Sequence, residues 1–159
     1  MQVDFYIISE HSQKDSNQLV CQLCEKALEQ NLSVFIYTES AEQAYLLDEL
    51  LWTYKADSFI AHNNLFAQST MPSSKQRAFQ YPVIIGSDLS TEQTLNPSQD
   101  NHLLINLSST DLLKRYTTIT QKFSRIAEVV GKNNNEKAIA RDRYRFYREK
   151  GYTLNKYDL

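Results

Sequence analysis

The stretches VDFYIIS, residues 3–9, and SVFIYT, residues 33–38, decide the fold of this chain. Both are short, apolar and rich in β-branched and aromatic residues, which predicts buried strands. Between them, apolar residues recur at helical spacing over residues 15–31, which predicts an amphipathic helix. The order strand, helix, strand predicts a parallel βαβ unit with a right-handed crossover.

The rest of the chain continues this alternation. Ser40 and Gln43 form an S-x-x-Q capping box at the start of a helix that runs to Trp52. Further pieces are predicted as extended chain at 57–62, 82–86 and 102–107, and as a helix over 111–130 that ends at Gly131. The fold class predicted is therefore α/β: a Rossmann-like, open, mainly parallel sheet with helices on both faces.

Length and composition place limits on organisation and compartment. With 159 residues, of which 42% are hydrophobic, we expect a single domain over residues 1–159 that can bury a sizeable core. Residues 64–100 are polar and predicted to be rich in loops. No apolar run approaches the ~20 residues of a membrane span, and the N-terminus does not have the pattern of a secretory signal. We expect a cytoplasmic protein with no membrane partner.

Motifs for cofactor chemistry are missing from the sequence. The three glycines are Gly86, Gly131 and Gly151, so no glycine-rich loop can bring backbone N–H groups onto phosphates after the first strand. We expect no nucleotide cofactor. Cys21 and Cys24 form a C-x-x-C inside a helical pattern with no second cysteine pair, which favours two structural buried thiols over a metal or redox site.

Catalytic motifs are equally scarce. The three histidines show no H-x-x-x-H pairing, and no G-x-S-x-G elbow marks a nucleophile. The members of a Ser/His/Asp triad can lie far apart in the sequence, so a triad without a local motif is compatible with this chain, but nothing indicates one here. We interpret His62 as a residue that orders a loop, and we expect no enzyme activity and no metal site.

A basic segment near the C-terminus carries the clearest functional signal. Residues 133–152, NNNEKAIARDRYRFYREKGY, are predicted to form one helix between an Asn135 N-cap and a left-handed Gly151. Six cations and three anions give this segment a net charge of +3. The whole chain carries −2, so the remainder carries −5 and the basic charge is local.

Helical spacing gives this charge a direction. At ~100° per residue, one face carries several cations around a tyrosine ring: Lys137, Arg141, Tyr144 and Arg148, with Arg145 at its edge. Ile139 and Phe146 lie roughly opposite and should face the core. Such a face suits an acidic, partly apolar partner, although a solvated surface with a core tyrosine would have the same spacing.

Three stretches resemble one known family. The run ARDRYRFYREKGYTLN, residues 140–155, is similar to the C-terminal signature of the chi-subunit family of bacterial DNA polymerase III. The run EQAYLLDELLWTYKADSFIAHN, residues 42–63, resembles its central motif, and FSRIAEVV, residues 123–130, resembles the segment before its last helix. The resemblance covers nearly the whole chain and is weakest over 64–100.

The resemblance implies a non-catalytic adaptor with two partners. One is the psi subunit of the clamp-loader complex, for which the matching residues are Trp52 and Phe59. The other is the acidic C-terminal tail of single-stranded DNA-binding protein, which ends in Pro-Phe. By resemblance, Arg141 would hold the tail's terminal carboxylate, and Val130 and Tyr144 would line a pocket for its phenylalanine. Lys137, Arg145 and Arg148 would meet the upstream acidic residues; Arg145 departs from the family pattern, where a lysine can occur.

Alternatives remain open at this level. Trp52 and Phe59 would equally fit core positions, because large aromatic residues are usually buried. A helicase could use the same surface instead of psi. The basic helix could also bind single-stranded nucleic acid directly, with Tyr144 and Tyr147 stacking on bases, although the acidic remainder of the chain favours only indirect contact with DNA.

Overall fold

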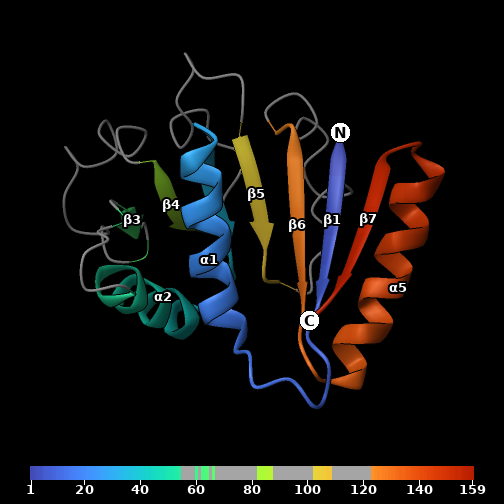
Figure 1. The fold of residues 1–159 in the computed structure, drawn as a ribbon, viewed down its shortest axis with the longest axis horizontal. Helices are drawn as coiled ribbons and strands as arrows, with labels where there is room; N and C mark the ends of the chain where they lie inside the picture. Colours follow the sequence, from blue (N-terminus) through green and yellow to red (C-terminus); the bar gives the residue numbers. More distant parts are fainter. Residues whose placement is uncertain (55–59, 61, 65, 67–81, 88–101, 109–122) are drawn as a thin grey trace.

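The described residues form a seven-stranded, open parallel sheet at the centre of the molecule (Figure 1). The computed structural model describes residues 1–54, 60, 62–64, 66, 82–87, 102–108 and 123–159. Within them the elements follow in the order β1 (Gln2–Ile7), α1 (Ser16–Glu29), β2 (Ser33–Tyr37), α2 (Ala41–Thr53), β3 (His62–Asn64), β4 (Val83–Gly86), β5 (His102–Asn106), β6 (Arg125–Val130), α5 (Asn134–Glu149) and β7 (Thr153–Asp158). The predicted α/β class is confirmed.

The order of the strands is β3-β4-β2-β5-β6-β1-β7, and every pair is parallel. Strands β1 and β2 are therefore parallel, as predicted, but β5 and β6 lie between them. The four central strands β2, β5, β6 and β1 are apolar because both of their faces are covered. Strands β1 and β6 end side by side, at the end of the sheet where α5 begins (Figure 1).

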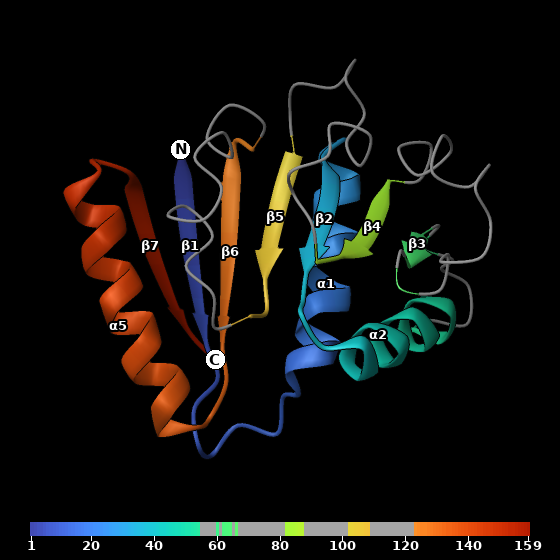
Figure 2. The ribbon, with the colours of Figure 1, turned by 180° about the vertical axis from the view of Figure 1, so that it is seen from behind.

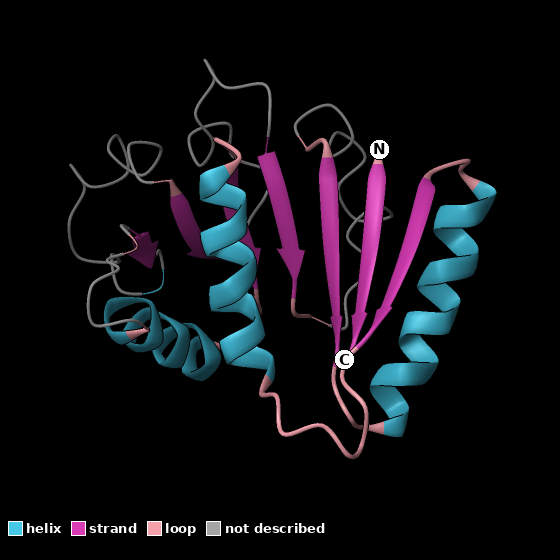
Figure 3. Cartoon of the chain, in the orientation of Figure 1, coloured by secondary structure: helices cyan, strands magenta, loops and turns pink. Residues whose placement is uncertain are grey.

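Helices cover both faces of this sheet. One core cluster joins α1 and α2 to the sheet through residues such as Leu23, Leu47 and Ile36. A second cluster, on the opposite face, joins Tyr147 of α5 to Phe5 and Leu104. Figure 2, seen from behind, and Figure 3, coloured by secondary structure, show α5 beside β7, far from α2 and β3. No helix in the described part of the chain is long and apolar enough to cross a membrane.

The predicted start of α2 is confirmed, with one difference in its hydrogen bonds. The Ser40 hydroxyl accepts a hydrogen bond from the backbone N–H of Gln43 at 3.1 Å, as an N-cap should. The second hydrogen bond of a capping box, from the Ser40 N–H directly to the Gln43 side chain, is replaced by two bonds through Thr38. The Ser40 N–H donates to the hydroxyl of Thr38 at 3.2 Å, and that hydroxyl donates to Oε1 of Gln43 at 2.8 Å.

The helix predicted over 111–130 is wrong at its end, because residues 125–130 form β6. Residues 109–122 lie outside the described part. β6 is a central strand, paired with β1 on one side and β5 on the other. Its sequence RIAEVV misleads because Ile126 and Val130 are four residues apart, a spacing that puts them on one face of a helix and also on one face of a strand. Glu128 between them breaks the apolar run.

The C-terminal strand β7 was absent from the prediction. The basic helix before it is confirmed, but its N-cap is Asn133, whose side chain accepts from the Asn135 N–H at 2.8 Å, rather than Asn135 itself. Gly151 has φ +80°, as predicted, and reverses the chain into β7. The extended piece predicted at 57–62 lies mostly outside the described residues, and β3 begins at its last residue, His62.

Candidate functional site

A buried polar cluster fixes α5 on the sheet. Glu128 of β6 is almost completely buried, and its Oε2 lies 2.8 Å from Nη1 of Arg143. Its Oε1 accepts a hydrogen bond from the Tyr147 hydroxyl at 2.5 Å. Nδ2 of Asn106 on β5 donates to both carboxylate oxygens at 3.2 Å, and Nη2 of Arg143 donates to the Ser108 carbonyl at 2.7 Å. A buried charge is tolerated when it is paired and hydrogen-bonded in this way.

These contacts correct the predicted orientation of the helix. The side chains buried on α5 are Arg143 and Tyr147, whereas Ile139 and Phe146, predicted to face the core, are only half-buried. The network also removes Arg143 from the surface charge. Because Arg143 and Tyr147 point inward, Arg141, Arg145 and Arg148 lie on the exposed side of the helix.

Beside α5 lies an open pocket of about 520 Å³. Strands β1 and β6 contribute apolar residues to it, α5 contributes one wall, and β7 contributes the other side. The lining residues are Phe5, Ile7, Val130, Lys137, Ala140, Arg141, Tyr144, Arg145, Arg148, Lys156 and Asp158. The structure thus brings together, around one cavity, all six residues that the resemblance assigned to peptide binding.

The apolar part of the pocket lies at the carboxyl end of the sheet. Val130 is the last residue of β6, and Ile7 is the last residue of β1 and pairs in register with it. The ring of Tyr144, which is 37% exposed, lies 5.4 Å from the ring of Phe5. A partly exposed aromatic ring over buried apolar residues forms a site that can hold an apolar side chain.

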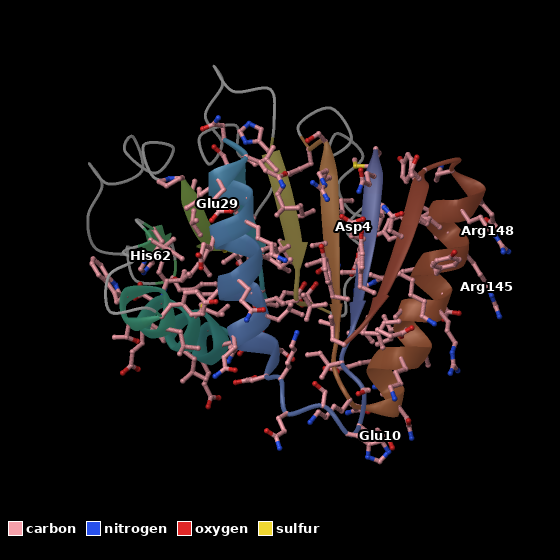
Figure 4. All side chains as sticks on the ribbon, viewed as in Figure 1. Asp4, Glu10, Glu29, His62, Arg145 and Arg148 are labelled. Atoms are coloured by element: carbon pink, nitrogen blue, oxygen red, sulfur yellow. The ribbon has the colours of Figure 1, made fainter. Side chains whose placement is uncertain are left out.

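Charge on the lining is strongly one-sided. Of the described residues that line the pocket, five are cationic and one, Asp158, is acidic. Arg141, Arg145 and Arg148 are exposed, and Figure 4 shows Arg145 and Arg148 extending from α5 away from the sheet. Two weak ion pairs lie at the rim, each at 3.9 Å: Lys137 with Glu10 and Lys156 with Asp158. The pocket is therefore suited to an anionic ligand with an apolar end.

Sequence reasoning missed the contribution of the two strands. Phe5, Ile7, Lys156 and Asp158 line the pocket because β7 pairs with β1 in a register that sets Lys156 beside Phe5 and Asp158 beside Ile7. Ala140 was missed as well. In the sequence, the only signal for β7 was the two-residue spacing of Leu154, Lys156 and Asp158. Because these residues do not form an apolar face, the spacing did not identify a strand.

A second surface of interest is the outer face of α2. Trp52 is 54% exposed, and Tyr45 and Leu46 of the same helix are also large, exposed hydrophobic residues. Trp52 therefore does not occupy the core position that its residue type favoured. Phe59, predicted to share this surface, lies outside the described residues. Exposed aromatic and aliphatic side chains on one helix are typical of a protein interface.

His62 links α2 to the chain that precedes β3 (Figure 4). Its Nε2 lies 2.5 Å from Oδ1 of Asp48, and its Nδ1 lies 2.7 Å from the carbonyl oxygen of Ile60. The Trp52 ring packs edge-on against the His62 ring at 5.0 Å. His62 thus joins α2 to Ile60, in agreement with an ordering role; residues 55–59 and 61 lie outside the described part of the chain.

The two cysteines are buried and free on α1. Burial, with a smaller effect of Asp15, raises the pKa of the Cys21 thiol to about 11. Burial raises the pKa of Cys24 further, and the neighbouring Cys21 adds to the shift. Both thiols are therefore protonated near neutral pH, which agrees with the structural interpretation.

Comparison with known proteins gives one family. The family model described as "DNA polymerase III chi subunit, HolC" matches residues 1–155. The chain is 32% identical over 159 residues to the DNA polymerase III subunit chi of Pseudomonas aeruginosa, covering 99% of this chain and 96% of that protein. It is 28% identical over 155 residues to the subunit chi of Escherichia coli, covering 95% and 93% of the two chains.

Among solved structures, the fold is similar to domain 2 of the DEAD-box helicase Mss116p, solved bound to an RNA duplex. The TM-score is 0.64 at 15% identity, and the match covers all of this chain but 65% of that one, less than two thirds of its length. At this identity the likeness concerns the fold alone.

Proposed function

The chain belongs to the DNA polymerase III chi-subunit family of replication accessory subunits, and from this we propose that it is a non-catalytic adaptor of the bacterial replicase. In this proposal the pocket beside α5 binds the acidic C-terminal tail of single-stranded DNA-binding protein. The α2 surface around Trp52 binds the psi subunit, with Phe59 as a second contact residue by resemblance, and so connects the chain to the clamp loader. A helicase could occupy the same α2 surface in place of psi.

One observation carries the first half of the proposal. The six residues that the resemblance assigned to peptide binding, from Val130 to Arg148, line a single pocket that combines an apolar floor with cationic walls. A tail that ends in Pro-Phe presents an aromatic side chain, a terminal carboxylate and acidic residues upstream. In the proposed arrangement the phenylalanine contacts Val130, Phe5 and Tyr144. Arg141 would hold the carboxylate in a charge-assisted hydrogen bond, since paired charges of this kind are stronger than neutral ones.

The upstream acidic residues of the tail would meet the remaining cations of α5. Arg145 and Arg148 are exposed on the wall of the pocket, and Lys137 is half-buried at its rim. Exposed cations of this kind attract an acidic segment over some distance and accelerate its association, an effect that salt screens. The apolar contact with the terminal phenylalanine would persist at high salt.

Direct binding of single-stranded nucleic acid is the weaker alternative. That alternative used Tyr144 and Tyr147 as stacking platforms, but Tyr147 is 3% exposed and donates to Glu128. Arg143 is paired inside the molecule as well. The helix therefore offers one ring and fewer cations to a nucleic acid than its sequence suggested.

A competition experiment tests the proposal. The full-length protein would be titrated into a fluorescent acidic peptide ending in Pro-Phe and, separately, into a fluorescent single-stranded oligonucleotide. We expect saturable binding of the peptide, competed by unlabelled peptide, and much weaker binding of the oligonucleotide. Tight binding of the oligonucleotide without binding of the peptide would contradict the adaptor proposal.

A further inference from the structure

The edge of the sheet next to the pocket has backbone groups that pair with no strand in the described part of the chain. β7 is the last strand in the sheet order and pairs with β1 alone among the described strands. The Thr153 N–H donates to the Met1 carbonyl at 3.2 Å, and the Leu159 N–H donates to the Ile7 carbonyl at 2.9 Å. The backbone N–H and C=O groups of successive residues in a parallel strand point to opposite sides of the strand. The odd-numbered residues of β7 therefore bond to β1, whereas Leu154, Lys156 and Asp158 direct their N–H and C=O groups outward.

The side chains at this edge belong to the pocket. Lys156 and Asp158 both line it, and both are exposed. Helix α5 runs along the same region and contributes cations from Lys137 to Arg148. These two residues are eleven positions apart, so the cationic wall extends over roughly 16 Å at 1.5 Å per residue. An extended peptide of about five residues spans the same length.

Unpaired strand edges recruit other chains, and proteins protect them with prolines, bulges, very short strands or charged side chains. β7 carries the charged residues Lys156 and Asp158 but no proline. β7 has six residues, and its regular register with β1 shows no bulge over residues 153–158. A groove between an edge strand and a helix is a recurring site for peptides that bind by adding a strand.

We infer that an acidic peptide held in this pocket adds as a further strand along the free edge of β7, pairing with the backbone of Leu154, Lys156 and Asp158. This inference rests on the proposed function and describes how the same site holds its peptide ligand. Alternate side chains of the added strand would point to the α5 side, where Arg145 and Arg148 carry the charge that complements acidic residues. The terminal residue would leave the edge and enter the apolar part of the pocket.

Amide hydrogen exchange measured by NMR tests this inference on the full-length protein. The probe is an acidic peptide ending in Pro-Phe, with binding followed on the same sample. We expect the amides of Leu154, Lys156 and Asp158 to exchange fast in the free protein and at least tenfold more slowly in the complex. The amides of Asn155 and Tyr157 already bond to β1 and serve as internal controls.

A set of peptides with one N-methylated backbone position each gives an independent measure. A strand that pairs on one side places every second N–H against β7, so methylation should weaken binding at alternate upstream positions only. The loss of one hydrogen bond corresponds to roughly three- to tenfold in affinity. The positions in between act as matched controls, because the same methyl group there faces solvent.

The outcomes separate this inference from the proposed function. Slower exchange at the three amides together with alternating sensitivity to methylation would support strand addition. Binding with unchanged exchange and uniform sensitivity would overturn strand addition while leaving the proposed function intact. Failure of the peptide to bind would overturn both. Protection that grows with protein concentration in the absence of peptide would mean that a second copy of the chain occupies this edge, and would overturn the inference.

Discussion

Oε2 of Glu128, on β6, lies 2.8 Å from Nη1 of Arg143, on α5, and both side chains are almost completely buried. This ion pair connects the sheet to the helix that carries the candidate site. Removing the cation would leave a buried carboxylate whose remaining hydrogen-bond donors, among the described residues, are Asn106 and Tyr147. The orientation of the pocket wall therefore depends on a contact between two residues that do not line the pocket.

The first prediction concerns this pair. Arg143→Ala should lower the free energy of unfolding by about 3–5 kcal/mol, because it leaves an uncompensated buried charge. Urea denaturation followed by circular dichroism measures this. Arg145→Ala, an exposed arginine on the same helix, is the control and should change stability by less than about 1 kcal/mol. Equal stabilities of the two variants would show that the pair does not anchor α5.

The second prediction concerns the α2 surface. Because Trp52 is 54% exposed, Trp52→Ala should cost the free protein no more than about 1 kcal/mol of stability, mainly through the lost contact with His62. It should weaken binding of a psi subunit by tenfold or more while the acidic peptide still binds. Calorimetry with both ligands measures this. Tyr157→Ala, an exposed aromatic residue on β7, is the control for psi. Unchanged psi affinity of Trp52→Ala would place that interface elsewhere.

The third prediction concerns the thiols. Burial raises the pKa of Cys21 to about 11, well above the ~8.5 of an unfolded cysteine. The native protein should therefore react slowly with a thiol reagent at pH 8 and rapidly in concentrated urea. Since the folded pKa is raised, its contribution to stability is complete below about pH 8.5 and is lost as pH rises toward 11. Rapid labelling of the native protein at pH 8 would contradict the buried environment.

The fourth prediction concerns the turn from α5 into β7. Gly151 has φ +80°, and nothing lies within 4 Å of the position a Cβ would take. Gly151→Ala should therefore destabilise through backbone strain alone, by about 1–2 kcal/mol. Gly151→Asn should cost less, because asparagine tolerates the left-handed conformation better. Thermal denaturation of both variants measures the difference, and an alanine variant as stable as the wild type would contradict it.

The strands and helices with a clear period were predictable from the sequence. Residues 3–9, 33–38 and 102–107 are mostly apolar because both faces of a central parallel strand are covered. The N-cap at Ser40 was predictable because capping is local chemistry. The order of the strands was not, since β1 and β2 are separated by strands that come much later in the chain.

The features that could not be predicted from the sequence depend on side-chain burial and on strand pairing. The period of β6 was ambiguous because Glu128, a residue usually exposed, is buried there by Arg143 and Tyr147. β7 carries no apolar pattern because it is an exposed edge strand. The cationic wall of the pocket was predicted from helical spacing and resemblance, whereas Phe5, Ile7 and Lys156 depend on the register of β7 with β1.

In the proposed function, the pocket beside α5 binds an acidic peptide by its terminal residue. Arg141 is exposed on the pocket wall between Lys137 and Tyr144. Arg141→Ala should remove a charge-assisted hydrogen bond to the peptide's carboxylate and weaken binding by about ten- to a hundredfold, or roughly 1.5–3 kcal/mol. Stability should barely change. Lys150→Ala is the matched control, since it removes the same charge from the end of the same helix outside the pocket lining.

The most direct measurement is calorimetric titration of wild type, Arg141→Ala and Lys150→Ala with two acidic peptides, one ending in Pro-Phe and one lacking the final phenylalanine. We expect that only the full peptide binds tightly, that Lys150→Ala binds it nearly as the wild type does, and that Arg141→Ala loses most of the affinity. Raising the salt concentration should weaken the wild-type complex without abolishing it, because exposed charges are screened and the apolar contact is not. Equal binding of the two peptides, or an Arg141→Ala protein that binds like the wild type, would contradict the assignment of this pocket.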